Sequence, residues 1–304
     1  MSTATVTAAV SDRAALTTLA RYETLRLARH PLFIVGTLLW VFVLATYVSD
    51  GAYGHAGYDL TGDRPNTSLD TPVAPAFMLG LLGLLAMNRI TSSAGRVGDA
   101  LEAAPVPEAR RTIALCLACL LPAAVGLAGS AYIFYVWMTD PPIYALGWNE
   151  YSDAELAAIL AGGVLACLGG PLLGVLVARW WHWPTAAAVT SVLLVLWAAL
   201  SMVVGKTFLL SLLHHSSPFA LVTGYADPNH WHEGGNLFLR LGYLTGLCAL
   251  AALGAVAHGT EGQARSRMAR WVVGTAVVTA GLLLLTVLAG PETYYVDDPT
   301  WPLQ

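Results

Sequence analysis

Seven apolar segments separated by short polar ones are spread along the whole chain of 304 residues. A membrane-spanning helix needs about 20 mainly apolar residues, because each residue adds about 1.5 Å across a hydrocarbon layer about 30 Å thick. Only 11% of the residues are charged, against roughly 25% in soluble domains, so the chain lacks the polar surface of a water-exposed globule. The sequence therefore predicts an all-α polytopic membrane protein with spans at 32–48, 73–87, 113–138, 156–178, 185–204, 237–257 and 271–289.

Basic and acidic residues fall on opposite sides of these predicted spans. With a cytoplasmic N-terminus, twelve of the fifteen Lys and Arg residues lie inside and thirteen of the nineteen acidic residues lie outside. Cytoplasmic segments carry the excess of basic residues in membrane proteins, so we expect the N-terminus in the cytoplasm and the C-terminus outside. Arginine outnumbers lysine, of which Lys206 is the single example, and Ala and Gly are frequent. This usage is typical of GC-rich bacterial genomes and predicts a bacterial plasma membrane.

The segment 13–30, ahead of the first span, has the pattern of an amphipathic helix at the membrane surface. On a helix, Leu16, Leu19 and Leu27 share one face, and Pro31 opens the next helix. Glu23 falls in the middle of this apolar face, where an unpaired carboxylate is costly. It pairs either with Arg26 or His30 nearby, or with an arginine of the following cytoplasmic loop, Arg96, Arg110 or Arg111.

That loop, 91–112, is the one sizeable cytoplasmic loop. It contains a short predicted helix, 99–104, which ends before Pro105 and Pro107. A short helix at the membrane surface has nothing of its own to pack against, so this pattern indicates that its partner is another protein.

Here the sequence resembles the ABC-2 type export permeases. Their coupling segment reads approximately R-x-G-x-x-L, three residues, then P-V, and Arg96, Gly98, Leu101, Pro105 and Val106 fit it. The segment with Glu23, Arg26, Arg29 and Pro31 resembles the connecting helix of that family. Ser217, Pro218 and Phe219 are similar to its outer re-entrant region.

The resemblance implies a type V ABC exporter-like bundle in which three regions divide the chain. Residues 1–31 would be the cytoplasmic N-terminus with the connecting helix. Residues 32–258 would be the six-span domain with the coupling loop 91–112 and an outer re-entrant region at 205–236. Residues 259–304 would add a basic loop, a seventh span that exceeds the six of the family, and an outer tail.

The resemblance also implies partners and roles. The chain would pair with a second permease, identical or related, and with two copies of a separate ATPase subunit that binds ATP and Mg. It would bind no cofactor or nucleic acid, and it would not be an enzyme by itself. Contacts with the ATPase would come from Leu101, Pro105 and Val106, with Arg96 and Gly98 in the same motif and Asp99, Glu102 and Glu108 at the polar rim.

The same family places the substrate path at the dimer seam, between the second and fifth spans. Candidates to face it are Asn88, Ser191, Trp197, Ser201 and Met202. Charged residues are scarce inside the spans, which argues against a proton relay and favours an apolar or amphipathic cargo.

The outer loop 205–236 leaves alternatives open. Its apolar run 208–213 predicts a re-entrant or interfacial hairpin, and an eighth span is the competing topology. His214, His215, His230 and His232 lie in this loop and raise the alternatives of a metal site or of a membrane enzyme. A further alternative is a membrane subunit without transport function that serves immunity or signalling. Two GxxxG patterns, 170–174 and 242–246, allow close approach between helices.

Overall fold

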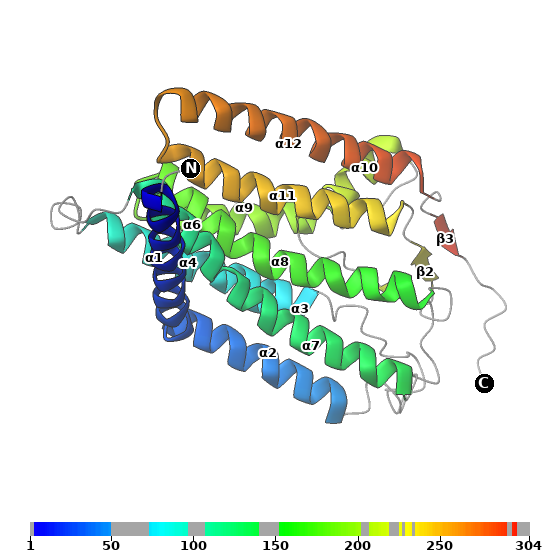
Figure 1. The fold of residues 1–304 in the computed structure, drawn as a ribbon. Coiled ribbons are helices and arrows are strands. Elements are labelled where there is room, and N and C mark those ends of the chain that lie inside the picture. The colour runs from blue at the N-terminus through cyan, green and yellow to red at the C-terminus, as the bar shows by residue number, and fades with distance from the viewer. Residues whose placement is uncertain are drawn as a thin grey trace.

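The computed structural model describes residues 3–49, 73–96, 107–139, 152–201, 207–218, 225–226, 229–232, 235–290 and 294–296. In this part of the chain, long helices lie side by side as a bundle, with a small sheet at one end (Figure 1). Helix is found at each of the seven predicted apolar segments. The helices are α1 (Thr3–Ala28), α2 (Pro31–Ser49), α3 (Val73–Pro75), the π-helical η1 (Ala76–Leu81), α4 (Leu82–Arg96), α6 (Glu108–Ala118), α7 (Leu120–Thr139), α8 (Asp153–Trp180), α9 (Ala186–Ser201), α10 (Phe208–His215), α11 (Leu237–His258) and α12 (Gly262–Leu288).

Five helical stretches are long and apolar enough to cross a membrane: Ala76–Ser93, Glu108–Val136, α8, α11 and α12. A sixth arises if α1 and α2, which are bent by 66° at their junction, count as one broken span. α9 has 16 residues and is about 24 Å long, so it is shorter than the hydrocarbon layer. The described residues thus confirm a helical architecture with five to six helices that could span a membrane by length and composition.

The two ends of the bundle carry different elements (Figure 1). One end, called the α1 end below, holds α1, the last turns of α4, the start of α6 and the turn between α11 and α12. The other end, called the sheet end, holds α10 and the strands. The described parts of the segments predicted to be inside meet at the α1 end (Figure 1).

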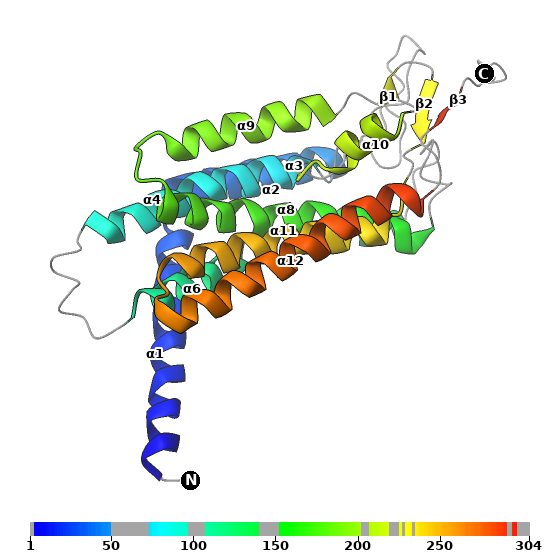
Figure 2. The same ribbon diagram turned by 90° about the horizontal axis from the view of Figure 1, so that it is seen from above.

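α1 lies across the bundle rather than along it, as Figure 2 shows. Pro31 is the first residue of α2 and has no N–H to continue the hydrogen bonding of α1. The face predicted to be apolar is the inner one, since Leu27 is fully buried and Leu16 and Leu19 are partly buried while Arg13 and Arg21 are exposed. α1 packs against α6 and touches α4.

α8 lies at the centre of the bundle and packs against α4, α7, α9 and α11. Its first turn is fixed by a capping box, in which Ser152 and Glu155 hydrogen-bond to each other's backbone N–H. Both GxxxG patterns lie at helix contacts. A Cβ at Gly170 would overlap the carbonyl of Gly80, and one at Gly246 would overlap the hydroxyl of Thr279 on α12. Small residues therefore set the distance between α8 and η1 and between α11 and α12.

The sheet end contains one feature that the sequence did not predict. The strands β1 (Tyr225–Ala226), β2 (Asn229–His232) and β3 (Tyr294–Val296) form an antiparallel sheet in the order β1-β2-β3. Tyr294 pairs with His232, and Val296 pairs with His230. This pairing attaches the segment that follows α12 to the loop that precedes α11.

The apolar run of the outer loop forms α10, which has eight residues. A helix of that length extends about 12 Å, so α10 does not cross a membrane. Residues 207–218 are therefore too short to cross by themselves, and residues 219–224, on which an eighth span would also depend, lie outside the described part. α10 packs against α9 and α12 at the sheet end.

Candidate functional site

The predicted coupling segment connects α4 to α6 at the α1 end. Its residues Gly98, Asp99, Leu101, Glu102, Pro105 and Val106 lie outside the described residues, and Arg96 is described only as the last residue of α4. The two helices that flank the segment are described. Their contacts define how the segment is attached to the rest of the bundle.

The end of α4 is attached to α1 through Arg26. Its guanidinium Nη1 lies 3.0 Å from the Glu23 carboxylate, and its Nη2 donates a hydrogen bond of 3.2 Å to the hydroxyl of Ser93 on α4. We call Glu23, Arg26 and Ser93 the α4 anchor. Glu23 and Arg26 lie one turn apart on α1. The structure therefore supports the first interpretation of Glu23, which is pairing with Arg26. The link to the loop region is made by Arg26 itself.

Burial raises the pKa of Glu23, and the neighbouring Arg26 opposes this by favouring the carboxylate. The pKa of His30, at the junction of α1 and α2, is shifted in the opposite direction from that of Glu23. Burial and then the charges of Arg89 and Arg26 lower its pKa. Its neutral form is also favoured because Nδ1 accepts a 3.3 Å hydrogen bond from the N–H of Leu32.

The start of α6 is attached to two other helices through Glu108. Its Oε1 accepts a 2.7 Å hydrogen bond from Nη1 of Arg179 on α8 and lies 3.5 Å from Nδ1 of His258 on α11. We call Glu108, Arg179 and His258 the α6 anchor. The Arg179 side chain is 13% exposed, whereas that of Glu108 is 46% exposed, so the anchor lies at the edge of the bundle.

Close packing supports this second anchor. Trp180 donates a 2.9 Å hydrogen bond from Nε1 to the carbonyl of Gly254, and its ring meets the ring of His258 edge to face at 5.4 Å. A Cβ at Gly259 would stand 3.0 Å from the backbone nitrogen of Ala109. Trp180 thus contacts α11 directly, and it is exposed like Trp181 and Trp183, as expected for residues at a membrane interface.

The two helices that flank residues 97–106 have different contacts. α4, before them, is attached to α1 through the α4 anchor, and α6, after them, is attached to α8 and α11 through the α6 anchor. α1 also packs against α6, so the helices on both sides of 97–106 contact α1.

Four of the five residues predicted to face a substrate path are described, and each of the four makes a hydrogen bond within the chain. Asn88 is buried and donates a 3.3 Å hydrogen bond to the carbonyl of Gly174 on α8. Ser191 and Ser201 are buried and bond to carbonyls of their own helix. Trp197 is 48% exposed and donates to the hydroxyl of Ser216, and Met202 lies outside the described residues. These contacts fit packing within one chain.

The histidines of the outer loop have structural surroundings where they are described. His214 is buried, and its Nδ1 lies 2.7 Å from the carbonyl of Ser201. Its ring contacts that of His215 at 5.2 Å. His230 and His232 lie on β2, where only the backbone is described. Among the described residues no group of three or more His, Cys, Asp or Glu side chains could hold a metal ion.

Two members of the α6 anchor, Arg179 and His258, were not predicted as site residues. Each lies at the end of an apolar segment, where a charged or polar side chain is expected for solubility alone. The only local signal was Glu108 in the first turn of a helix that follows a proline. No known protein family, curated protein or solved structure matches this chain.

Proposed function

We propose that this chain is the transmembrane permease subunit of an ATP-driven exporter of the ABC-2 type. The observation that carries the proposal is that both helices flanking residues 97–106 are attached to other helices, α4 to α1 by the α4 anchor and α6 to α8 and α11 by the α6 anchor. A segment that a partner protein moves must be connected to membrane-spanning helices on both sides, since otherwise its displacement would not reach those helices.

In this proposal the α1 end faces the cytoplasm. The twelve basic residues assigned to the inside all belong to segments at this end, in line with the excess of basic residues on that side of membranes. α1 and β3, the first and last described elements, lie at opposite ends of the bundle (Figure 1), which fits an odd number of crossings. In the proposal the short α9 is one of these crossings.

The proposed cycle divides the work between two kinds of subunit. A separate ATPase receives residues 98–106 in a surface groove and hydrolyses ATP with Mg. Closure of two ATPase copies moves the segment, and the anchors pass the displacement to α1, α8 and α11. The spans of two paired permeases then alternate between inward-open and outward-open states and release an apolar or amphipathic cargo outside.

The proposal is tested by co-expression with an ABC ATPase encoded beside this gene. We expect the ATPase to copurify with the chain and its hydrolysis rate to change when the chain is present. Leu101→Asp and Pro105→Gly should abolish that change, because each disturbs the apolar contact that the resemblance assigns to the segment. Leu209→Asp is the matched control, since Leu209 is 72% exposed on α10 at the sheet end.

Three outcomes would contradict the proposal in different ways. Copurification with no change in hydrolysis would favour an immunity or signalling subunit. An activity that is independent of nucleotide and lost on changing His230 or His232 would favour a membrane enzyme. Labelling of a cysteine placed at Leu101 from the outside of intact cells would reverse the orientation.

A further inference from the structure

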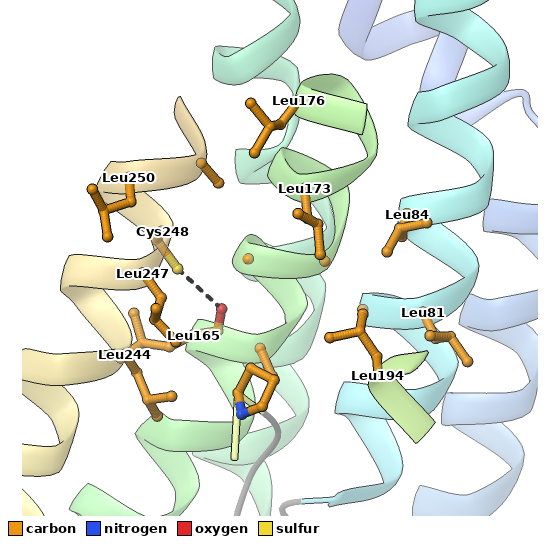
Figure 3. Close-up of a pocket in the computed structure, with 16 residues that line it drawn as sticks. Leu81, Leu84, Leu165, Leu173, Leu176, Leu194, Leu244, Leu247, Cys248 and Leu250 are labelled. Atoms are coloured by element: carbon orange, nitrogen blue, oxygen red, sulfur yellow. Dashed lines mark hydrogen bonds between the residues drawn. The ribbon is translucent and has the colours of Figure 1, made fainter. Parts of the chain in front are cut away.

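A half-open apolar groove of about 290 Å³ runs between α4, α8, α9 and α11 (Figure 3). Leu81, Leu84 and Leu194 line one wall, and Leu244, Leu247 and Leu250 line the other, with α8 between them. An apolar cavity of about 150 Å³ holds a benzene-sized molecule, so this groove has room for a ligand about twice as large.

The groove exists because small residues of α8 lie between two separated helices. Ala166, Gly169 and Gly170 form part of its floor. α9 packs on the α4 side of α8, and α11 packs together with α12 on the other side. The π-helical stretch η1 contributes Gly80, whose carbonyl lies against Gly170. This contact places Leu81 and Leu84 at the edge of the groove.

The groove runs parallel to the helices that could span the membrane. From Leu165 to Leu176 it follows α8 for about 16 Å. Pro218, which follows α10, lines it as well, and the turn before Pro218 is held by Tyr243 and Arg240 through the carbonyls of Ser216 and Ser217. The groove therefore has a fixed boundary near the sheet end.

The lining of the groove favours an apolar ligand. All sixteen lining residues are apolar or small, and the Cys248 thiol already donates to the carbonyl of Leu165 at 3.5 Å. A ligand with a polar group at this depth would lose hydrogen bonds to water without replacing them. A whole helix does not fit, because 16 Å of helix about 10 Å across would fill roughly 1,200 Å³.

We propose that the groove is a binding site for one acyl chain of a membrane lipid. An acyl chain is apolar along its length, narrow, and oriented along the membrane normal, as the groove is. Each buried CH₂ group contributes to binding, and leucine walls supply the contacts. The inference requires only that the bundle lies in a bilayer, so it is independent of the proposed export function.

The test uses the full-length chain in phosphatidylcholine vesicles that contain a small share of the same lipid with a diazirine on one acyl chain. After a chase with unlabelled lipid, light converts the diazirine to a carbene that inserts into nearby residues, and peptide mapping locates the adducts. We expect segments 165–176 and 244–251 to retain several-fold more label than the α12 segment with Val277 and Val278. These valines are 67% and 61% exposed and report lipid that exchanges freely.

A variant that fills the groove should remove the excess. Leu173→Trp should lower labelling of the two groove segments to the α12 level, while Leu193→Trp, on the exposed side of α9, should leave it unchanged. Leu247→Trp fills the groove from the opposite wall and replaces Leu173→Trp if that variant does not fold. Equal labelling of groove and α12 segments, or an excess that both filling variants leave intact, would overturn the proposal, as would crosslinks from the groove to a second copy of the chain.

Discussion

Different kinds of contact join the helices at the two ends of the bundle. At the α1 end, charged side chains join helices through the α4 and α6 anchors, and the Glu108 side chain is 46% exposed. At the sheet end, His214, Tyr243 and Arg240 bond to backbone carbonyls in largely buried surroundings. Partly exposed ion pairs contribute less stability than fully buried hydrogen bonds, which are costly to break. We therefore expect the α1 end to rearrange and the sheet end to stay fixed.

Arg240→Met should produce the largest loss of stability. Arg240 is 5% exposed and donates a 3.2 Å hydrogen bond to the carbonyl of Ser217. Its removal leaves that carbonyl without a charged donor, at a cost of about 2–3 kcal/mol. Unfolding in detergent micelles, followed by tryptophan fluorescence, measures the loss. Arg267→Met, on an exposed turn of α12, is the matched control, and equal losses in both variants would contradict a rigid sheet end.

Tyr243→Phe should have a smaller effect of the same kind. It removes a single 2.7 Å hydrogen bond from the Tyr243 hydroxyl to the carbonyl of Ser216 and keeps the ring, so we expect a loss of about 1 kcal/mol. The same unfolding assay applies. Tyr135→Phe on α7, where the side chain is 63% exposed, should change stability little, and a loss as large as that of Tyr243→Phe would weaken the comparison.

Glu108→Gln should separate stability from function at the α1 end. The amide keeps the size of the side chain but loses the charge that faces Arg179 and His258. We expect a loss of stability below about 1 kcal/mol, because the pair is partly exposed, together with a clear loss of ATPase coupling in the co-expressed complex. Glu261→Gln, at an exposed position at the same end, should affect neither. A Glu108→Gln variant that is fully coupled would remove the α6 anchor from the proposed mechanism.

The smallest expected effect concerns pH at the junction of α1 and α2. Burial and the charges of Arg89 and Arg26 lower the pKa of His30 below its value of 6.5 in the unfolded chain. The unfolded state then binds more protons, so this contribution to stability is present above about pH 6.5 and is lost as the pH falls through the lower folded pKa. Glu23, whose pKa is raised, changes stability in the opposite sense.

His30→Asn isolates this contribution, because the Asn side-chain oxygen can accept the hydrogen bond from Leu32 without titrating. Thermal unfolding of both proteins between pH 7.5 and about pH 5 should show a smaller decrease in the variant. Identical pH profiles would show that His30 does not titrate with folding.

The sequence predicted individual helices well and their ends less well. Residues 237–257 were predicted as a span, and α11 runs from Leu237 to His258. By contrast, α12 begins at Gly262 rather than near Trp271, and α6 begins at Glu108 rather than at residue 113. Polar turns continue a helix beyond the apolar layer, since the backbone hydrogen bonds do not depend on hydropathy.

The candidate site was predictable only where its contacts are local. The pairing of Glu23 with Arg26 lies within one turn and was one of two stated interpretations. The α6 anchor joins residues far apart in the sequence, Glu108 with Arg179 and His258, and no local pattern connects them. The short strands were also missed, because β3 pairs with β2 across the whole of α11 and α12.

The sequence by itself determined that the chain forms apolar helices and that basic residues gather at one end of them. Transfer of each side chain into an apolar layer has its own free energy, and these free energies add along the chain. The tertiary structure alone decided which glycines meet a neighbouring backbone, which charges pair at the α1 end, and that a groove remains beside α8. Those features depend on distances between segments that are remote in sequence. Transfer free energies added residue by residue along the chain contain no information about these distances.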